Sequence, residues 1–206
     1  PDHTGGNENM GNAGIVIVAH SNVRKRLAVD NFIEMFAMEA PATDEAGLPV
    51  ITFDDALSFH LNEDEIHISH VESAHTDGDS IVQFRAANVM HLGDIYFSGM
   101  YPFIDTNSGG SINGTLKALD RALALSDAQT VIIPGHGPIS NKEGLVAYTN
   151  MLKTINGHIQ KMIACKSTLA QILATEPTKD FDEEYGNGFI NNTASVEMLN
   201  TDKTQE

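Results

Sequence analysis

The sequence predicts an α/β (α+β) fold in which helices and strands form separate layers. Short apolar and β-branched runs cluster in the middle of the chain, and helical patterns stand on both sides of them. The strands and helices do not alternate regularly, which favours layered α/β or α+β architecture. The chain has 206 residues, 41% of them hydrophobic. That is enough for a sizeable core, so we expect a single domain over residues 1–206.

The first elements are predicted from the run GIVIVAH (14–20), which is short, apolar and β-branched and therefore typical of a buried strand. Ser21 is a suitable N-cap for a helix over 22–39, where apolar residues recur at helical spacing. Short apolar or alternating runs then predict further strands. They cover residues 51–53, 56–61, 65–71, 80–84 and 88–93.

The second half of the chain predicts two helices around one more strand. Residues 110–126 have the spacing of an amphipathic helix, 130–135 (TVIIPG) form a buried strand, and 141–164 form a long helix. Beyond Pro177 the chain is polar and contains Gly- and Asn-rich turns. We therefore expect a loosely packed tail from about residue 177.

The charge balance restricts the classes of partner. Twelve Lys and Arg against 28 Asp and Glu give a formal net charge of −16. Nucleic acids and anionic membranes require surplus Lys and Arg, so neither is an expected partner. No apolar run approaches the roughly 18 residues that a membrane span needs. The sequence leaves both the cytoplasm and the periplasm open, and it does not indicate an oligomeric state.

Five side chains that can bind metal ions lie at strand ends or beside glycines. They are Asp2 and His3 at the start, His75 in SAHTDGDS, Asp94 in HLGDIYF and His136 in IIPGHGP. Imidazole nitrogens and carboxylate oxygens are donors that zinc and iron accept, and a carboxylate can bridge two cations. Because loops at strand ends are held by the sheet, they can converge on one point. Together the five residues predict a metal site.

In chain order, DHTGG, AHTDGDS, LGDIYF and IIPGHGP resemble the successive motifs of the metallo-β-lactamase superfamily. Other segments, such as FDDALSFHL, YPFID and GGSINGTLKALD, are similar to a bacterial branch of uncharacterised hydrolases of that family. The resemblance implies an αββα sandwich with a di-metal site, usually zinc, at one edge between the two sheets.

The resemblance also implies a role for each of the five residues. Asp2, His3 and His136 would hold the second metal, His75 the first, and Asp94 would bridge both. Asp2 and Asp94 would be catalytic, since Asp2 could also orient the attacking hydroxide or carry a proton to the leaving group.

Further residues near these motifs are expected to support the site. Asp77 and Asp79 follow His75 and are expected to fix its ring, the alternative being that they form or cap a turn. Four aromatic residues follow Asp94 and are expected to wall the substrate pocket, the alternative being that they pack a long loop onto the sheet. They are Tyr96, Phe97, Tyr101 and Phe103.

The family's first motif reads His-x-His-x-Asp-His, and only its end is present here. Asp2 and His3 match the last two positions, and Pro1 matches the variable residue before them. We therefore expect two further histidines and several N-terminal strands of the domain to precede Pro1. A chain lacking them would expose a sheet edge. Expressed alone, it is expected to aggregate or bind metal poorly and to lack hydrolase activity.

The resemblance supports three hypotheses for function. The first is a di-zinc hydrolase in which metal-activated hydroxide attacks the ester, thioester, lactone or amide carbonyl of a small-molecule substrate. The second is an iron-dependent oxidoreductase of the same fold, such as a persulfide dioxygenase, because the same ligands can hold iron. The third is an inactive, truncated binding module.

Overall fold

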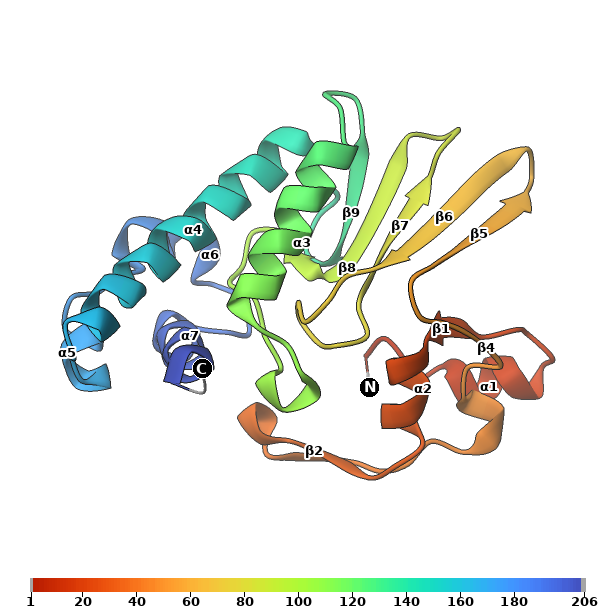
Figure 1. The fold of residues 1–206 in the computed structure, drawn as a ribbon, viewed down its shortest axis with the longest axis horizontal. Coiled ribbons are helices and arrows are strands. Elements are labelled where there is room, and N and C mark those ends of the chain that lie inside the picture. The colour runs from red at the N-terminus through yellow and green to blue at the C-terminus, as the bar shows by residue number, and fades with distance from the viewer. Residues whose placement is uncertain (1, 205–206) are drawn as a thin grey trace.

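A five-stranded sheet forms the centre of the fold (Figure 1). The computed structural model describes residues 2–204, and Pro1 lies outside them. The strands lie in the order β5-β6-β7-β8-β9, and all neighbours are antiparallel except β8 and β9, which run parallel. Their bounds are β5 Ala56–Leu61, β6 Asp64–His70, β7 Ser80–Phe84, β8 Val89–Phe97 and β9 Val131–His136. The mixed α/β class predicted from the sequence is confirmed.

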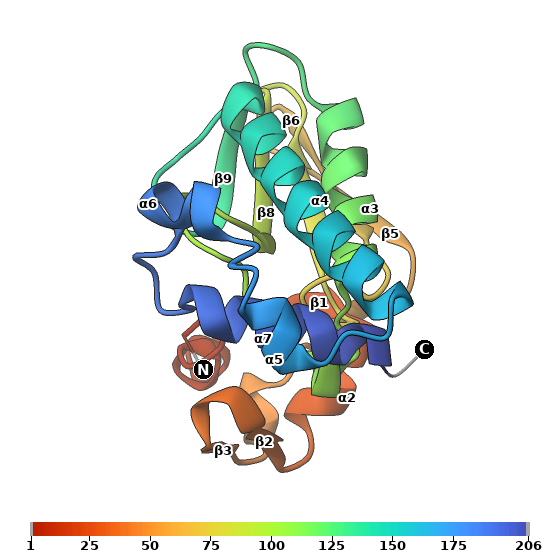
Figure 2. The same ribbon diagram turned by 90° about the vertical axis from the view of Figure 1, so that its left-hand side faces the viewer.

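Two helices, α3 (Ile112–Leu125) and α4 (Lys142–Ala164), cover one face of this sheet (Figures 1 and 2). On that face Ile81, Met90 and Ile132 are at most 1% exposed and share one core with both helices. The opposite face carries apolar side chains that are only half-buried. They are Leu57, Phe59, Ile66, Ile68, Val82 and Phe84. The core therefore lies between the sheet and the two helices.

The N-terminal segment consists of short elements that lie below the sheet in Figure 1. β1 (Val18–His20) pairs in parallel with β4 (Ile51–Phe53), and β2 (Asn31–Ile33) forms an antiparallel pair with β3 (Met38–Ala40). The short helices of this segment are α1 Asn7–Asn12, α2 Ser21–Leu27, and the 3-10 helices η1 Glu34–Phe36 and η2 Glu45–Gly47.

The predicted helix over 22–39 is wrong beyond Leu27. Nδ2 of Asn31 donates hydrogen bonds to the carbonyls of Arg26 and Val29, at 2.7 and 2.8 Å. It thereby satisfies carbonyl groups at the end of α2 that a further helical turn would otherwise use. The chain then enters the β2–β3 hairpin instead.

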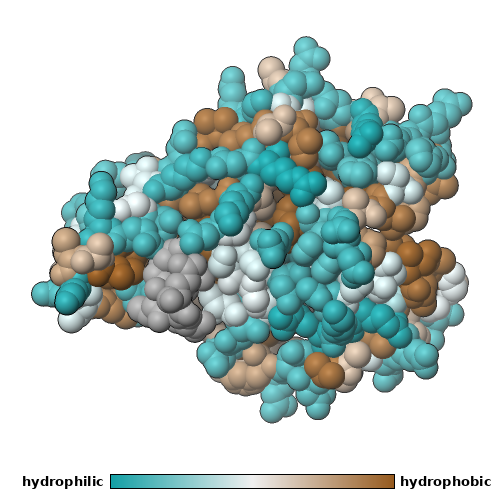
Figure 3. All heavy atoms as spheres, in the orientation of Figure 1, coloured by the Kyte–Doolittle hydropathy of each residue, from teal (hydrophilic) through white to brown (hydrophobic). Residues whose placement is uncertain are grey.

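The predicted buried strand over 14–20 is also too long. Only Val18–His20 pairs with another strand, whereas Ile15 and Val16 are 55% and 58% exposed. Figure 3 shows hydrophobic atoms at the right-hand edge, over the region where Figure 1 places β1 and β4. The residues before Val18 therefore have the composition of a buried strand without a neighbour to cover them.

His20 joins this N-terminal segment to the central sheet. Its Nδ1 accepts a hydrogen bond from the Asn22 amide, so His20 and not Ser21 caps α2. Nε2 therefore carries the proton and donates to the Asp54 carbonyl at 3.0 Å. The ring stacks on His70 of β6, with centroids 3.7 Å apart. Burial, and next the nearby His70, lower the pKa of His20, which keeps the imidazole neutral in the folded protein.

This arrangement predicts an acid-sensitive contribution to stability. The folded-state pKa of His20 lies below the unfolded value of about 6.5, so its contribution is complete above that pH and is lost as the pH falls through the folded-state pKa. His20→Asn keeps a side chain that caps helices well but does not titrate. We expect the wild type to lose more stability than His20→Asn between pH 7.5 and 5.5 in urea denaturation. Parallel losses in the two proteins would contradict this prediction.

The predicted loose packing of the tail from about residue 177 is wrong. The segment contains η4 Lys179–Phe181, α6 Asp182–Tyr185 and α7 Asn192–Thr204, and α5 Leu169–Leu173 precedes it (Figure 2). Ile190, Val196 and Leu199 are at most 1% exposed and belong to the main core. The segment is polar on average, but most of its apolar side chains are buried, with Phe189 as an exposed exception. No helix within residues 2–204 is long and apolar enough to cross a membrane.

Candidate metal centre

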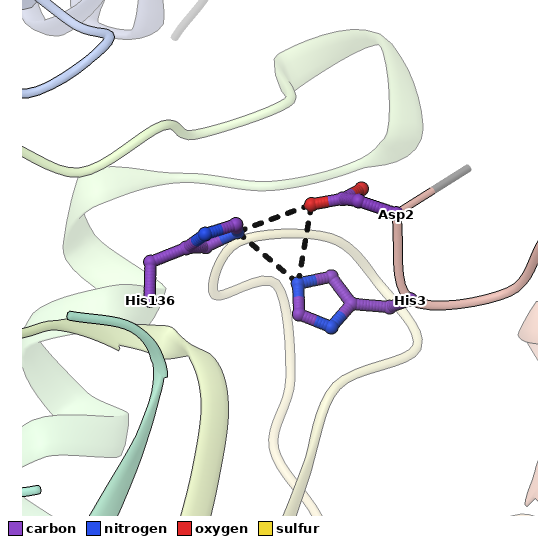
Figure 4. Close-up of side chains that lie close together, drawn as sticks. All are labelled: Asp2, His3 and His136. Carbon is purple, nitrogen blue, oxygen red and sulfur yellow. Dashed lines mark hydrogen bonds and ion pairs between the residues drawn. The ribbon is translucent and has the colours of Figure 1, made fainter. Parts of the chain in front are cut away.

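Three side chains from two parts of the chain that are far apart in the sequence meet at the edge of the sheet (Figure 4). Asp2 and His3 precede α1, and His136 is the last residue of β9. Nε2 of His3 and Nε2 of His136 are 3.1 Å apart, and Oδ2 of Asp2 lies 3.4 and 3.2 Å from them. Partial burial raises the pKa of Asp2, but its own amide and the two imidazoles lower it more. The net lowering makes Asp2 a carboxylate at neutral pH.

Asp94, on β8, lies between this group and His75. Its Oδ1 is 3.2 Å from Nε2 of His3 and 3.5 Å from Nε2 of His136. Its Oδ2 is 3.5 Å from Nε2 of His75, which comes from the loop between β6 and β7. The structure thus brings together all five side chains that the sequence singled out, and one carboxylate faces both groups.

The donor set fits a cation. Donors that share one tetrahedral zinc ion at about 2.0–2.1 Å lie roughly 3.3 Å from each other. The separations around Asp2, His3, His136 and Oδ1 of Asp94 range from 3.1 to 3.5 Å. Oδ1 of Asp94 is also buried, and no described residue donates a hydrogen bond to it. A buried carboxylate oxygen without a donor is costly, and a bound cation would satisfy it.

The ring of His75 is oriented by a backbone carbonyl. Its Nδ1 lies 2.8 Å from the carbonyl oxygen of Phe103. Because a carbonyl only accepts, Nδ1 carries the proton and Nε2 presents its lone pair toward Asp94. The amide of Asp105 also donates to the His75 carbonyl at 2.9 Å. The loop after β8 therefore holds both the ring and the backbone of His75.

The prediction that Asp77 or Asp79 fixes the His75 ring is wrong, since Phe103 and Asp94 account for both ring nitrogens. Asp77 instead accepts two hydrogen bonds from Arg26, at 2.8 and 2.7 Å, and this contact lowers the pKa of its carboxyl. Asp79 accepts from the amide and hydroxyl of Thr76. Burial raises the pKa of Asp79, against the opposing effects of His75 and Thr76. Both aspartates brace the backbone of the His75 loop.

Two glycines let neighbouring segments approach the ligands. A Cβ on Gly135 would lie 2.0 Å from Oδ1 of Asp94, and a Cβ on Gly110 would lie 2.1 Å from the carbonyl oxygen of His75. The absence of a side chain at Gly135 therefore leaves room for the carboxylate of Asp94. Gly110, directly before the N-cap Ser111 of α3, was not anticipated.

A cavity of about 1140 Å³ opens beside the five residues, and its aromatic wall differs from the expectation. Tyr96 and Tyr101 do not line it: they are 3% and 0% exposed and lie in the core. The Tyr101 hydroxyl donates to Oδ1 of Asp182 at 2.8 Å. Phe97 and Phe103 do line the cavity, and Phe36 and Phe189 join them from distant segments. The one signal for Phe36 in the sequence, an apolar residue at helical spacing, indicated the wrong structure.

Comparison with known proteins connects this geometry to a family. The sequence model described as "Metallo-beta-lactamase superfamily" matches residues 1–136. A search of curated proteins found no match.

Solved structures share the fold at low sequence identity. A metallo-beta-lactamase from Pontibacter korlensis aligns with a TM-score of 0.56 and 17% identity over 74% of this chain. The BLEG-1 B3 metallo-beta-lactamase aligns with a TM-score of 0.59 and 15% sequence identity over 72% of this chain. TTHA1623 in a di-iron-bound form aligns with a TM-score of 0.57 and 21% sequence identity over 72% of this chain. The chain spans 64% of the first of these structures and 70% of each of the other two. At these identities the likeness concerns the fold alone.

Proposed function

Because the chain belongs to the metallo-beta-lactamase superfamily, we propose that it binds two metal ions and hydrolyses an ester, thioester, lactone or amide of a small molecule. The observation that carries this proposal is the position of Asp94. One of its oxygens faces His3 and His136, and the other faces His75. A carboxylate placed between two groups of imidazoles is suited to bridge two cations.

In this proposal Asp2, His3 and His136 hold one ion together with Asp94, and His75 and Asp94 contribute to the other. Zinc bound there would polarise a substrate carbonyl and acidify a water molecule. Asp2 is 62% exposed and lines the cavity, so its carboxylate can accept a proton and pass it to a leaving group. Catalytic zinc usually has three protein ligands. We therefore expect the Asp2 side to bind metal more tightly than the His75 side.

An iron-dependent oxidoreductase is the second candidate. The five side chains offer only nitrogen and oxygen donors, and iron as well as zinc binds such donors in proteins. TTHA1623, one of the structures with the same fold, is in a di-iron-bound form. The same site could therefore hold iron and carry out redox chemistry on a persulfide.

Metal analysis combined with a substrate panel tests both candidates. We expect purified full-length protein to contain zinc and to hydrolyse at least one member of a panel of lactones, thioesters, phosphoesters and β-lactams. Turnover should stop with a chelator and return with zinc. Bound iron together with oxygen consumption in the presence of a persulfide would replace the hydrolase proposal. Absence of both metal and turnover would favour the inactive binding module.

A further inference from the structure

The cavity beside the metal centre lies between the β2–β3 hairpin and the aromatic residues around His136. Ile33, Phe36 and Met38 face it from the hairpin, and Phe97, Phe103 and Phe189 face it from the other side. A cavity of about 1140 Å³ with apolar and aromatic side chains in its walls has the form of a small-molecule site. The five candidate metal ligands belong to its lining, and further polar and acidic side chains lie elsewhere along it.

Phe36 and Phe189 link the two sides of the cavity. Phe36 stands edge-on to Phe103, with ring centroids 5.2 Å apart, and lies 6.4 Å from Phe189. Phe189 in turn stands edge-on to His136 at 5.2 Å. Yet Phe36 is 43% exposed and Phe189 is 50% exposed. Two aromatic rings beside a cavity and half open to solvent leave apolar surface that a ligand can cover.

The charges of the cavity argue against an anionic ligand group. Arg26 is the one Lys or Arg among the described residues that line it. Both Nε and Nη2 of Arg26 are held by Asp77 at 2.8 and 2.7 Å. Away from the metal centre, the lining includes the carboxylates Glu8, Glu39 and Asp44. An anionic substituent would meet these acidic groups without a free guanidinium or ammonium to neutralise it.

From these observations we propose that the cavity binds the neutral apolar part of the substrate, an alkyl chain or aryl ring attached to the scissile carbonyl, and that Phe36 determines its specificity. That the bound group is attached to a carbonyl that is cleaved rests on the proposed hydrolase function. That the bound group is apolar rests on the cavity alone. Phe36 is a specificity residue in contact with substrate, and it takes no part in the chemistry.

Phe32 provides a matched control for Phe36. Both are phenylalanines of the same hairpin, and Phe32 is 52% exposed, close to the 43% of Phe36. Phe32 does not line the cavity, whereas Phe36 does. Because Phe36 also contacts Phe103 and Phe189, thermal unfolding of both variants is measured first. A difference in binding between the folded variants then reports on the cavity.

The first experiment measures binding without catalysis. N-phenyl-1-naphthylamine, a neutral fluorescent probe, is titrated into metal-free protein, which has no tryptophan to interfere. We expect saturable binding, weakened about fivefold or more by Phe36→Ala because apolar contact area is lost. Phe36→Leu should retain most of the affinity, and Phe32→Ala should bind like the wild type. Equal affinities of Phe36→Ala and Phe32→Ala would overturn the inference.

The second experiment uses zinc-loaded protein and p-nitrophenyl esters from acetate to decanoate. We expect kcat/KM to rise with chain length in the wild type and in Phe32→Ala. In Phe36→Ala the preference for the long esters should fall by roughly tenfold, mainly through KM. A flat dependence on chain length, or preference for p-nitrophenyl phosphate, would overturn the inference. If neither these esters nor any member of the wider substrate panel is cleaved while probe binding still depends on Phe36, the hydrolase proposal fails and the apolar cavity stands.

Discussion

Replacing Asp94 with alanine is expected to abolish metal-dependent hydrolysis and to leave at most one metal ion bound. Asp94 is the side chain that faces both the His3–His136 group and His75. Its loss removes a donor from each ion, and the interaction of paired cations with the developing charge is worth several kcal/mol. That corresponds to a fall in kcat/KM of about 10³-fold or more. Metal content by mass spectrometry and kcat/KM on the best substrate of the panel measure the two effects.

Asp120→Ala is the control, because Asp120 is 53% exposed and pairs with Lys153 outside the site. A second variant, Asp94→Asn, separates metal binding from folding. In metal-free protein Oδ1 of Asp94 is buried without a hydrogen-bond donor, so the neutral amide should be at least as stable as the carboxylate. With zinc added the wild type should be more stable than Asp94→Asn, because metal that binds the folded wild type stabilises it. If Asp94→Ala kept full activity, Asp94 would not act as a bridge between two metal ions.

The convergence of the five side chains could be predicted from the sequence because their positions are set by simple geometry. His136 ends a buried strand, and His75 sits between two strands, so the sheet carries both side chains to one edge. The orienting contact on His75 was missed because it comes from the carbonyl of Phe103, 28 residues away. A backbone carbonyl has no signature in the sequence.

The aromatic wall shows where periodicity misleads. The pairing of β8 with β9 contains register shifts between His91 and Gly93 and again between Gly93 and Phe97. Such irregularities change which face a residue occupies. Nothing in the sequence places Phe97 at the cavity and the adjacent Tyr96 in the core. In the same way, apolar residues at helical spacing over 22–39 indicated a helix, although Phe36 lines a cavity from a hairpin.

Gly135→Ala is expected to impair the site as strongly as loss of a ligand, although the substitution adds a single methyl group. The new Cβ would lie 2.0 Å from Oδ1 of Asp94 and 2.6 Å from the carbonyl carbon of Gly93. Since the second contact is with backbone, a side-chain rotation cannot relieve it, and β8 and β9 must move apart or Asp94 must shift. A displacement of about 1 Å at a reacting centre costs on the order of 10²-fold in rate. We expect kcat/KM to fall at least that far, with weaker zinc binding by isothermal titration.

The matched control is Gly157→Ala, because a Cβ on Gly157 of α4 would meet nothing within 4 Å. In the middle of a helix alanine should raise stability by roughly 0.5–1 kcal/mol relative to glycine, with no change in zinc affinity. The two substitutions make the same chemical change, but only Gly135→Ala is expected to weaken zinc binding and lower kcat/KM. If Gly135→Ala bound zinc like the wild type, the carboxylate of Asp94 would have room to move without loss of the site, and a tightly fixed bridge between the two metal positions would be ruled out.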